Sequence, residues 1–139
     1  MFITYENEIS LEAYRTLRDA VGFHTMTERQ LTASLLNCEL IVTAYDGGFA
    51  VGMVRLLWDK GYAFSLYDVM VLPEYQGHGI GREMIERVLC HIKNLSLPGE
   101  SYLVSLMAAK GKEPFYEKFG FLRRPDEKYG SGMSFWFGN

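Results

Sequence analysis

Apolar and polar residues recur along the chain with two periods, one typical of helices and one typical of strands. Ser10 can cap a helix that ends before Gly22, and Thr27 with Gln30 has the spacing of a capping box for a second helix. A shorter helix is predicted over Lys112–Phe119, where Gly120 follows. The clearest helix has an apolar stripe at i, i+3, i+4, i+7, i+8 and i+11, made of Gly81, Met84, Ile85, Val88, Leu89 and Ile92.

Alternating and continuous apolar runs predict the strands. The turn residues Asp46-Gly47-Gly48 join two long runs into a hairpin, and Pro73 ends the next run. The predicted strands are Phe2–Tyr5, Leu40–Ala44, Phe49–Trp58, Ala63–Leu72, Tyr102–Ala108 and Met133–Phe137. This order of elements indicates one α/β (α+β) domain over residues 1–139, with a mixed, mostly antiparallel central sheet covered by helices on both faces.

Composition narrows the class of protein. The 139 residues, 48% hydrophobic and 22% charged, are ordinary for one globular domain. A net charge of −3 lacks the basic excess of nucleic-acid binders, so no nucleic acid is expected as a partner. No apolar run approaches the ~18 residues of a membrane span, so no membrane is expected either. The N-terminus lacks the pattern of a secretion signal, and two cysteines suit a reducing compartment. We therefore expect a cytoplasmic protein in which Cys90, beside Leu89, is buried.

A glycine-rich loop lies between the strand that Pro73 ends and the clearest helix. In Gln76-Gly77-His78-Gly79-Ile80-Gly81 the alternate glycines allow several N–H groups to point into one concavity at the helix N-terminus, which favours a phosphate or pyrophosphate site. A tight turn that only lets the helix pack is the alternative. The loop is not a Walker loop, because Arg82-Glu83 follows Gly81, and neither register completes G-x-G-x-x-G.

The segment from Asp68 to Arg82 resembles the strand–loop–helix unit of the GCN5-related N-acetyltransferases. Gln76, Gly79 and Gly81 match their acetyl-coenzyme A motif, Gln/Arg-x-x-Gly-x-Gly/Ala, and Phe115–Phe121 resembles their second signature. The resemblance extends from about Leu40 to Arg124 and is weaker over the first 39 residues.

This resemblance implies acetyl-coenzyme A as co-substrate, held where two strands splay apart. The strand before the loop would offer backbone groups to the pantetheine arm, with a bulge near Met70 and the Val71 N–H polarising the thioester carbonyl. Tyr116 matches the family's usual general acid, which protonates the departing thiolate. The implied cofactor-binding residues are Val69, Met70, Val71, Gln76, Gly77, His78, Gly79, Ile80, Gly81 and Arg82.

Other polar residues give weaker indications. Candidate general bases are Ser65, Tyr67, Asp68 and Asp59, and none is singled out, since a structural hydrogen bond suits Asp68 better. His24 is a candidate for the acceptor site. The histidines and cysteines lack metal-ligand spacing, so no metal is expected.

The leading hypothesis is an acetyl-coenzyme A-dependent N-acetyltransferase that acts on a small-molecule primary amine by direct transfer in a ternary complex. The alternatives are an acyl-coenzyme A-binding module with weak catalysis, and a protein or peptide N-acetyltransferase. The acceptor is not specified, although the acidic balance favours a cationic amine. We expect a homodimer, and the glycine-containing loop over residues 123–133 either closes over the acceptor or forms a subunit contact.

Overall fold

The structure, a computed structural model, describes residues 1–138 as two compact units, which divide the chain into Met1–Val104 and Ser105–Asn139. The elements in chain order are β1 (Ile3–Glu6), α1 (Leu11–Ala20), α2 (Glu28–Leu36), β2 (Leu40–Asp46), β3 (Phe49–Trp58), β4 (Ala63–Val71), the 3₁₀ turn η1 (Pro73–Tyr75), α3 (Ile80–Leu95), β5 (Leu103–Ser105) and α4 (Glu113–Glu117).

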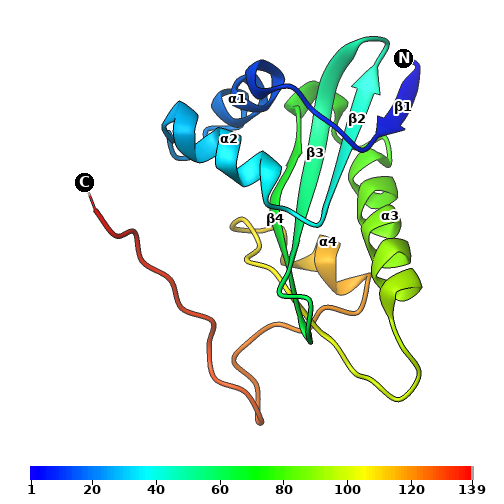
Figure 1. Cartoon of the computed structure of the whole chain (residues 1–139), viewed down its shortest axis with the longest axis vertical. Helices are drawn as coiled ribbons and strands as arrows, with labels where there is room; N and C mark the ends of the chain where they lie inside the picture. Colours follow the sequence, from blue (N-terminus) through cyan, green and yellow to red (C-terminus); the bar gives the residue numbers. More distant parts are fainter. Residues whose placement is uncertain (139) are drawn as a thin grey trace. The chain divides into compact units, whose positions relative to one another are not determined.

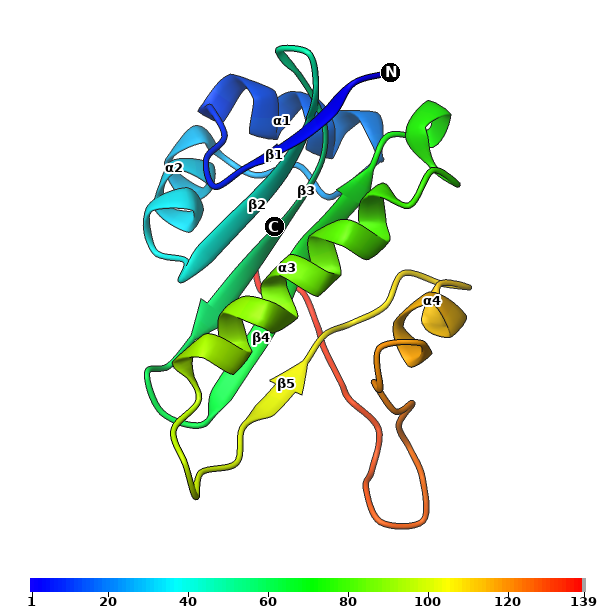
Figure 2. The same ribbon diagram turned by 90° about the vertical axis from the view of Figure 1, so that its right-hand side faces the viewer.

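The five strands form one mixed sheet in the order β1-β2-β3-β4-β5. Strands β1 to β4 are labelled in Figure 1 and β5 in Figure 2. Neighbours among the first four are antiparallel, and the turn predicted at Asp46-Gly47-Gly48 joins β2 to β3. The Leu103 N–H of β5 donates to the Tyr62 carbonyl at the beginning of β4, over 2.8 Å. The predicted fold class, a mostly antiparallel mixed sheet with flanking helices, is confirmed.

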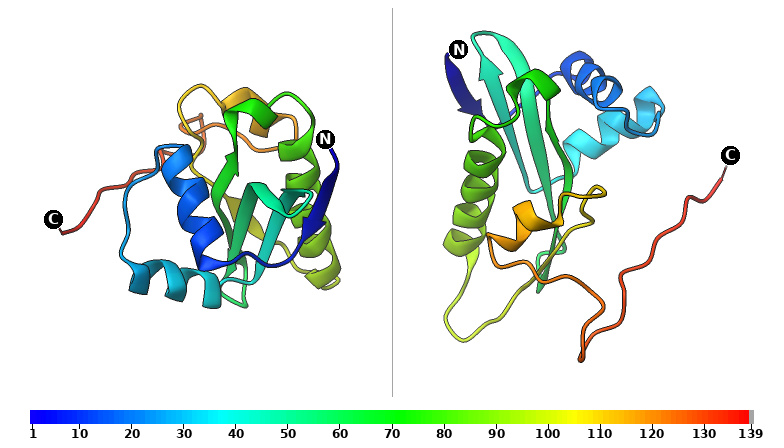
Figure 3. Two further views of the ribbon diagram at one scale, coloured as in Figure 1. Left: turned by 90° about the horizontal axis from the view of Figure 1, so that it is seen from above. Right: turned by 180° about the vertical axis from the view of Figure 1, so that it is seen from behind.

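Helices cover both faces of the sheet: α1 and α2 lie on one face and α3 on the other (Figures 2 and 3). The predicted caps are present, since the Ser10 hydroxyl accepts from the Ala13 N–H at 3.0 Å and Thr27 forms a capping box with Gln30. Among the described residues, none of the helices combines the length and the apolar character that crossing a membrane requires.

Helix α3 is held by the predicted apolar stripe. Met84, Ile85 and Val88 are fully buried, and burial of each such side chain contributes about 1.5–3 kcal/mol to stability. Ile80, at the first position of the helix, is also buried at 2% exposure. The start of α3, where the glycine loop ends, is therefore fixed against the sheet. The prediction for Cys90 was wrong: it is exposed, because it follows Leu89 by 100° around the helix and lies outside the stripe.

The second unit contains α4 and a small cluster of aromatic rings. Phe115 contacts Tyr116 and Phe119 edge-on, with ring centroids 5.0 and 5.4 Å apart, and Tyr116 contacts Phe121 at 6.1 Å. Arg123 forms an ion pair with Glu117 over 2.8 Å. The helix predicted over Lys112–Phe119 is thus present as a shorter one.

The strand predicted at Met133–Phe137 was wrong: these residues form no regular structure, and Met133 and Phe137 are 91% and 92% exposed. The strand predicted over Tyr102–Ala108 is reduced to β5. Apolar alternation creates a surface that can be buried, but a strand also needs a neighbouring strand that accepts its backbone hydrogen bonds. In the described part of the chain, residues 133–137 have no such neighbour.

Strands β3 and β4 approach each other closely at Gly52. A Cβ atom at this position would lie 2.8 Å from the Met70 carbonyl oxygen and 3.3 Å from Met84 Cε. The Met70 oxygen belongs to the main chain, so it cannot move aside as a flexible side chain would. Gly52 therefore determines how deeply the end of β4 sits against β3.

We predict that Gly52→Ala lowers the free energy of unfolding by about 1–3 kcal/mol, because the added methyl group overpacks the contact with Met70. Chemical denaturation measures the change. Gly48→Ala in the hairpin turn is the control, since a Cβ there meets nothing within 4 Å. Equal stability of the two variants would contradict the close approach.

Candidate active site

Strand β4 departs from regular pairing at a β-bulge. Met53 of β3 pairs with Met70 and Arg55 pairs with Tyr67, so Val54 faces two residues, Asp68 and Val69. Asp68 has a φ of +54°, a backbone conformation that is uncommon for residues other than glycine. A bulge was expected near Met70, and it lies one to two positions before that residue.

The three residues after Asp68 lead from the bulge to the glycine loop. Met70 is buried, Val69 and Val71 are half-buried, and the Leu72 N–H donates to the Val51 carbonyl at 2.9 Å. The structure thus places Val69, Met70 and Val71 at the end of β4 opposite to the end where β5 is bonded. Their role in binding a pantetheine arm stays a prediction.

The glycine loop presents main-chain N–H groups at the start of α3. Gly77 and Gly79 have φ values of +82° and +80°, and Gly79 is the N-cap of the helix without a side-chain cap. The Glu83 N–H donates to the Gly79 carbonyl, which begins the helical ladder. Among the described residues, the N–H groups from Gly77 to Arg82 have no acceptor, so six donors are available to an external anion.

Side chains hold this loop on the sheet. The Gln76 amide donates to the Val71 carbonyl at 3.0 Å, which links the loop to the last residue of β4. The Tyr75 hydroxyl donates to Asp46 Oδ2 at 2.6 Å, and the Phe2 N–H donates to Asp46 Oδ1 at 2.9 Å. These two donors, Tyr75 first, lower the pKa of Asp46 below its usual value. Sequence analysis placed Asp46 in a turn only and gave Tyr75 no role, because no motif links the two residues.

The remaining predicted loop residues differ in how their side chains are placed. His78 is exposed, whereas Ile80 is buried in the sheet-facing side of α3. The Arg82 side chain is 74% exposed and pairs with Glu86 over 2.9 Å. Of these three residues, Ile80 packs the start of α3 against the sheet, and Arg82 forms an ion pair with a residue one turn further along the same helix.

Tyr116 lies in the second unit, on α4. It is 8% exposed, and burial raises the pKa of its phenol to about 12. The hydroxyl therefore keeps its proton throughout the neutral range, as a hydrogen-bond donor or general acid requires.

Asp68 lies in a cluster of charges that sequence analysis did not assemble. Its carboxylate accepts from the Tyr14 hydroxyl, from Arg18 Nη1 at 2.8 Å and from Arg55 Nε at 2.6 Å. Burial, and then the hydrogen bond to Asp68, raise the pKa of Tyr14 to about 12. The preference for a structural hydrogen bond at Asp68 is confirmed, and a carboxylate that already accepts from three donors is a poor general base.

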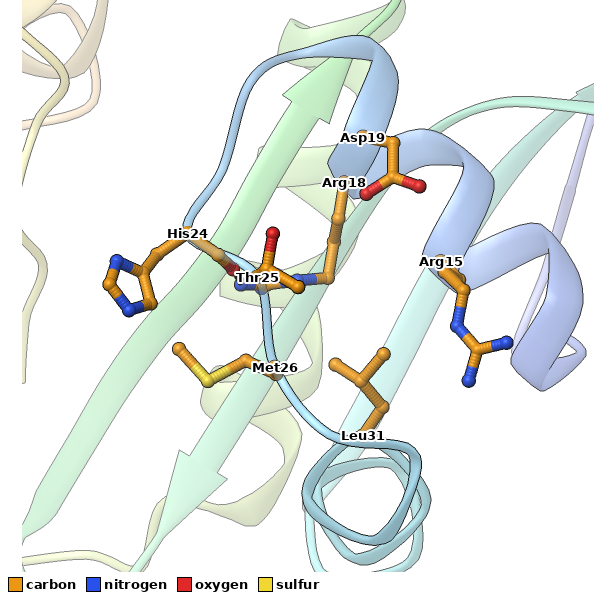
Figure 4. Close-up of a pocket in the computed structure, with 7 residues that line it drawn as sticks. All are labelled: Arg15, Arg18, Asp19, His24, Thr25, Met26 and Leu31. Atoms are coloured by element: carbon orange, nitrogen blue, oxygen red, sulfur yellow. Dashed lines mark hydrogen bonds between the residues drawn. The ribbon is translucent and has the colours of Figure 1, made fainter. Parts of the chain in front are cut away.

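A small cavity of about 90 Å³ lies beside this cluster, and Arg18 contributes to both (Figure 4). Its lining residues come from α1, from the loop after it and from α2: Arg15, Arg18, Asp19, His24, Thr25, Met26 and Leu31. The His24 carbonyl accepts from Arg18 Nη2 at 2.7 Å, and the acceptor role of His24 stays a prediction. Within residues 1–138 no group of three or more His, Cys, Asp or Glu side chains could hold a metal ion.

The sequence matches a family model that describes an acetyltransferase (GNAT) domain, over residues 37–123. The chain belongs to this family. It is 26% identical to an uncharacterized N-acetyltransferase, ycf52, of Pyropia yezoensis, over 99% of this chain and 77% of the relative. It is 28% identical to serotonin N-acetyltransferase 2 of Oryza sativa, over 84% of this chain and 57% of that one.

A solved structure supports the same conclusion. A protein of unknown function and probable acetyltransferase from Staphylococcus aureus is 34% identical and superposes with a TM-score of 0.87, covering 98% of this chain and 100% of that chain. This GNAT chain is thus an acetyltransferase with the family's fold.

GNAT acetyltransferases use acetyl-coenzyme A, and the loop residues fit its diphosphate. A Cβ at Gly77 or Gly79 would meet nothing within 4 Å, so no other part of the described chain covers these two glycines on that side. A diphosphate matches the free N–H groups of the loop because it offers several acceptors and negative charge at a helix N-terminus.

We predict that Gly79→Ala weakens binding of acetyl-coenzyme A by about tenfold or more, because the methyl group enters the space expected for the diphosphate. Titration calorimetry measures the dissociation constant. Gly99→Ala is the matched control, since Gly99 has a φ of +83° and equal open space but lies after α3. Equal losses of affinity in both variants would show that backbone strain alone is responsible.

Proposed function

We propose that this GNAT chain transfers the acetyl group of acetyl-coenzyme A directly to a small-molecule primary amine within a ternary complex. The observation that carries the proposal is the run of free N–H groups from Gly77 to Arg82, directly after the bulged end of β4. The bulge supports a thioester site and the loop supports a diphosphate site, one after the other along the chain. A rice relative named a serotonin N-acetyltransferase favours a small amine as acceptor.

In this proposal the chain contributes mainly backbone groups. The N–H groups of residues 77–82 would hold the diphosphate, and the backbone of Val69, Met70 and Val71 would hold the pantetheine arm. The Val71 N–H would donate to the thioester carbonyl oxygen, where negative charge develops during acyl transfer. Acetyl-coenzyme A supplies the activated acyl group.

Tyr116 is proposed as the general acid that donates its proton to the leaving thiolate. A thiol titrates near 8.5, whereas the pKa of Tyr116 is about 12, so full proton transfer from the phenol is uphill even when the thiolate is completely formed. The phenol therefore acts mainly as a hydrogen-bond donor to the developing thiolate, and a proton that it gives up is replaced by the one that the attacking amine releases. This limits its contribution to the lower part of the range of general acids, about 10²-fold.

The proposal also includes a cytoplasmic location and a homodimer. The low cysteine content supports the reducing compartment. The general base stays unassigned among the other candidates, because Asp68 is committed to its three donors.

A thiol-release assay over a panel of amines tests the proposed function. Wild-type protein is mixed with acetyl-coenzyme A and with each of several polyamines, amino sugars, amino acids, arylalkylamines or a peptide, and free coenzyme A is followed with a thiol reagent. Amine-dependent release with a small amine supports the proposal. Tight cofactor binding without release for any amine indicates a binding module, and release only with the peptide indicates a protein acetyltransferase.

We predict that Tyr116→Phe lowers the single-turnover rate of acetyl transfer by about 10²-fold, near 3 kcal/mol, while the affinity for acetyl-coenzyme A changes little. The ring contacts with Phe115 and Phe121 remain, so the melting temperature should stay close to that of wild type. Tyr129→Phe, which removes a half-exposed hydroxyl from the same unit, is the control. A rate within twofold of wild type would make Tyr116 a packing residue.

The raised pKa of Tyr116 also predicts a pH dependence. The protonated phenol makes its full contribution to the stability of the fold below its unfolded pKa of 10.0, and this contribution is lost as the pH rises through about 12. In the folded protein the phenol therefore stays protonated up to nearly pH 12. Any change of the transfer rate between about pH 6 and 10 therefore belongs to other groups. Wild type and Tyr116→Phe should give rate profiles of the same shape in this range, and an alkaline limb below pH 10 that disappears in the variant would contradict the pKa of about 12.

A further inference from the structure

The carboxylate of Asp68 joins three elements of the first unit. Its donors are Tyr14 and Arg18 on α1 and Arg55 on β3, and Asp68 itself lies on β4. The side chains of Arg18 and Arg55 are each 10% exposed and that of Asp68 is 7% exposed. These ion pairs are therefore largely shielded from water, and removal of one charged group leaves the opposite charge shielded and uncompensated.

Both arginines are fixed by further contacts on the helical side. Arg18 Nη2 donates to the His24 carbonyl at 2.7 Å, and its guanidinium lies 5.5 Å from the centre of the Phe23 ring. Arg55 Nη1 donates to the Ser34 carbonyl of α2 at 3.2 Å. Asp68 is thus connected to α1, to the loop after it and to α2.

Asp68, which accepts from Tyr14, Arg18 and Arg55, is also the residue with unusual backbone geometry. Asp68 has a φ of +54° at the bulge, a conformation that persists in a non-glycine residue when the surroundings over-determine it. Three donors aimed at one short side chain provide that constraint. The direction of the backbone after the bulge depends on where the carboxylate is held.

Charge explains why a neutral side chain cannot replace it. Two guanidinium groups share one carboxylate, so loss of this carboxylate leaves two shielded cations near each other without an anion. Their repulsion, and the lost bonds, would release the bulge from α1 and β3. The loop from Gln76 to Arg82 contacts this region through Gln76, which donates to the Val71 carbonyl, and it is anchored separately by Tyr75 on Asp46 and by the buried Ile80.

We propose that Asp68 is a positioning residue for acetyl transfer. Held by Tyr14, Arg18 and Arg55, it fixes the bulge and thereby the orientation of the backbone groups of residues 69–71 that receive the thioester. The inference rests on the proposed function. It separates two tasks along the chain: the loop provides affinity for the nucleotide part, and the bulge places the acetyl group.

The test compares Asp68→Asn with wild type in two measurements on the full chain. Hydrogen exchange without ligand at the Leu72 amide, which donates to the Val51 carbonyl, reports how firmly the end of β4 is held on β3. Calorimetry with coenzyme A and with acetyl-coenzyme A gives the preference for the acetylated form. Glu39→Gln is the matched control, because Glu39 is a part-buried carboxylate paired with Lys60 and His91, apart from the bulge.

The expected result for Asp68→Asn is exchange of the Leu72 amide faster by about tenfold or more, and loss of the preference for acetyl-coenzyme A. Affinity for coenzyme A itself should stay within about threefold, because the loop keeps its separate anchors at Tyr75 and Ile80. Glu39→Gln should match wild type in both measurements. A merely stabilising role for Asp68 would lower the affinity for both ligands together, in proportion to the unfolded fraction, and would overturn the proposal.

Two further variants keep the test decisive. Asp68→Gly accommodates the φ of +54° without the carboxylate, so wild-type behaviour of this variant would show that backbone geometry alone suffices and would overturn the proposal. If both Asp68 variants unfold, Tyr14→Phe removes one donor and keeps the ion pairs, and it must shift exchange and preference in the same direction. Wild type that binds neither ligand overturns the proposed function itself, whereas unchanged variants of a binding wild type overturn only the role of Asp68.

Discussion

Strand β4 is constrained from two sides where it leaves regular sheet geometry. On one side, the carboxylate of Asp68 is held by donors from α1 and β3. On the other, Gly52 of β3 lets the Met70 carbonyl approach to a distance at which no Cβ atom would fit. Because β3 contributes to both constraints, the path of β4 from the bulge to the glycine loop follows from its pairing with this one neighbour. The N-terminal helices and the loop then attach to a strand whose course is already determined.

The charge of the whole chain is a poor guide to the charge near this strand. The net charge is −3, and it favours a cationic acceptor when considered alone. At the bulge, however, two arginines face one aspartate, and the adjacent cavity is lined by Arg15 as well as Arg18. Asp19 also lines this cavity, so three arginines stand against two aspartates, and the surroundings of the bulge are more positive than the net charge of the chain suggests.

Local signals predicted most of the fold. Each of these signals acts between residues that are close together in the chain, so the sequence alone is enough to predict the element. Examples are the capping residues Ser10 and Thr27, the turn at Gly47-Gly48 and the apolar stripe of α3. The errors concern partners that are distant in the chain. A strand at residues 133–137 needs a neighbour that apolar alternation cannot specify, and the exposure of Cys90 depends on how wide a stripe the sheet covers.

The candidate site likewise has a part that could be predicted from neighbouring residues and a part that could not. The glycine loop was predictable, because glycines with positive φ and the following helix are adjacent in sequence. The cluster at Asp68 was not, since it joins residues 14, 18, 55 and 68 without any motif, although a hydrogen-bonding role for Asp68 itself was expected. Gly52 gave no local signal either, because its importance comes from a facing strand.

That the loop offers only main-chain groups has a consequence for divergence. Every residue except proline has the same N–H group, so a site made of such groups tolerates replacement of many of the side chains along it. His78 and Arg82 expose their side chains and can vary freely, whereas the glycines at 77 and 79 are restricted by backbone conformation. Such a site can persist while most of the surrounding sequence drifts. A chain that is only 34% identical can therefore superpose on this one over nearly its whole length.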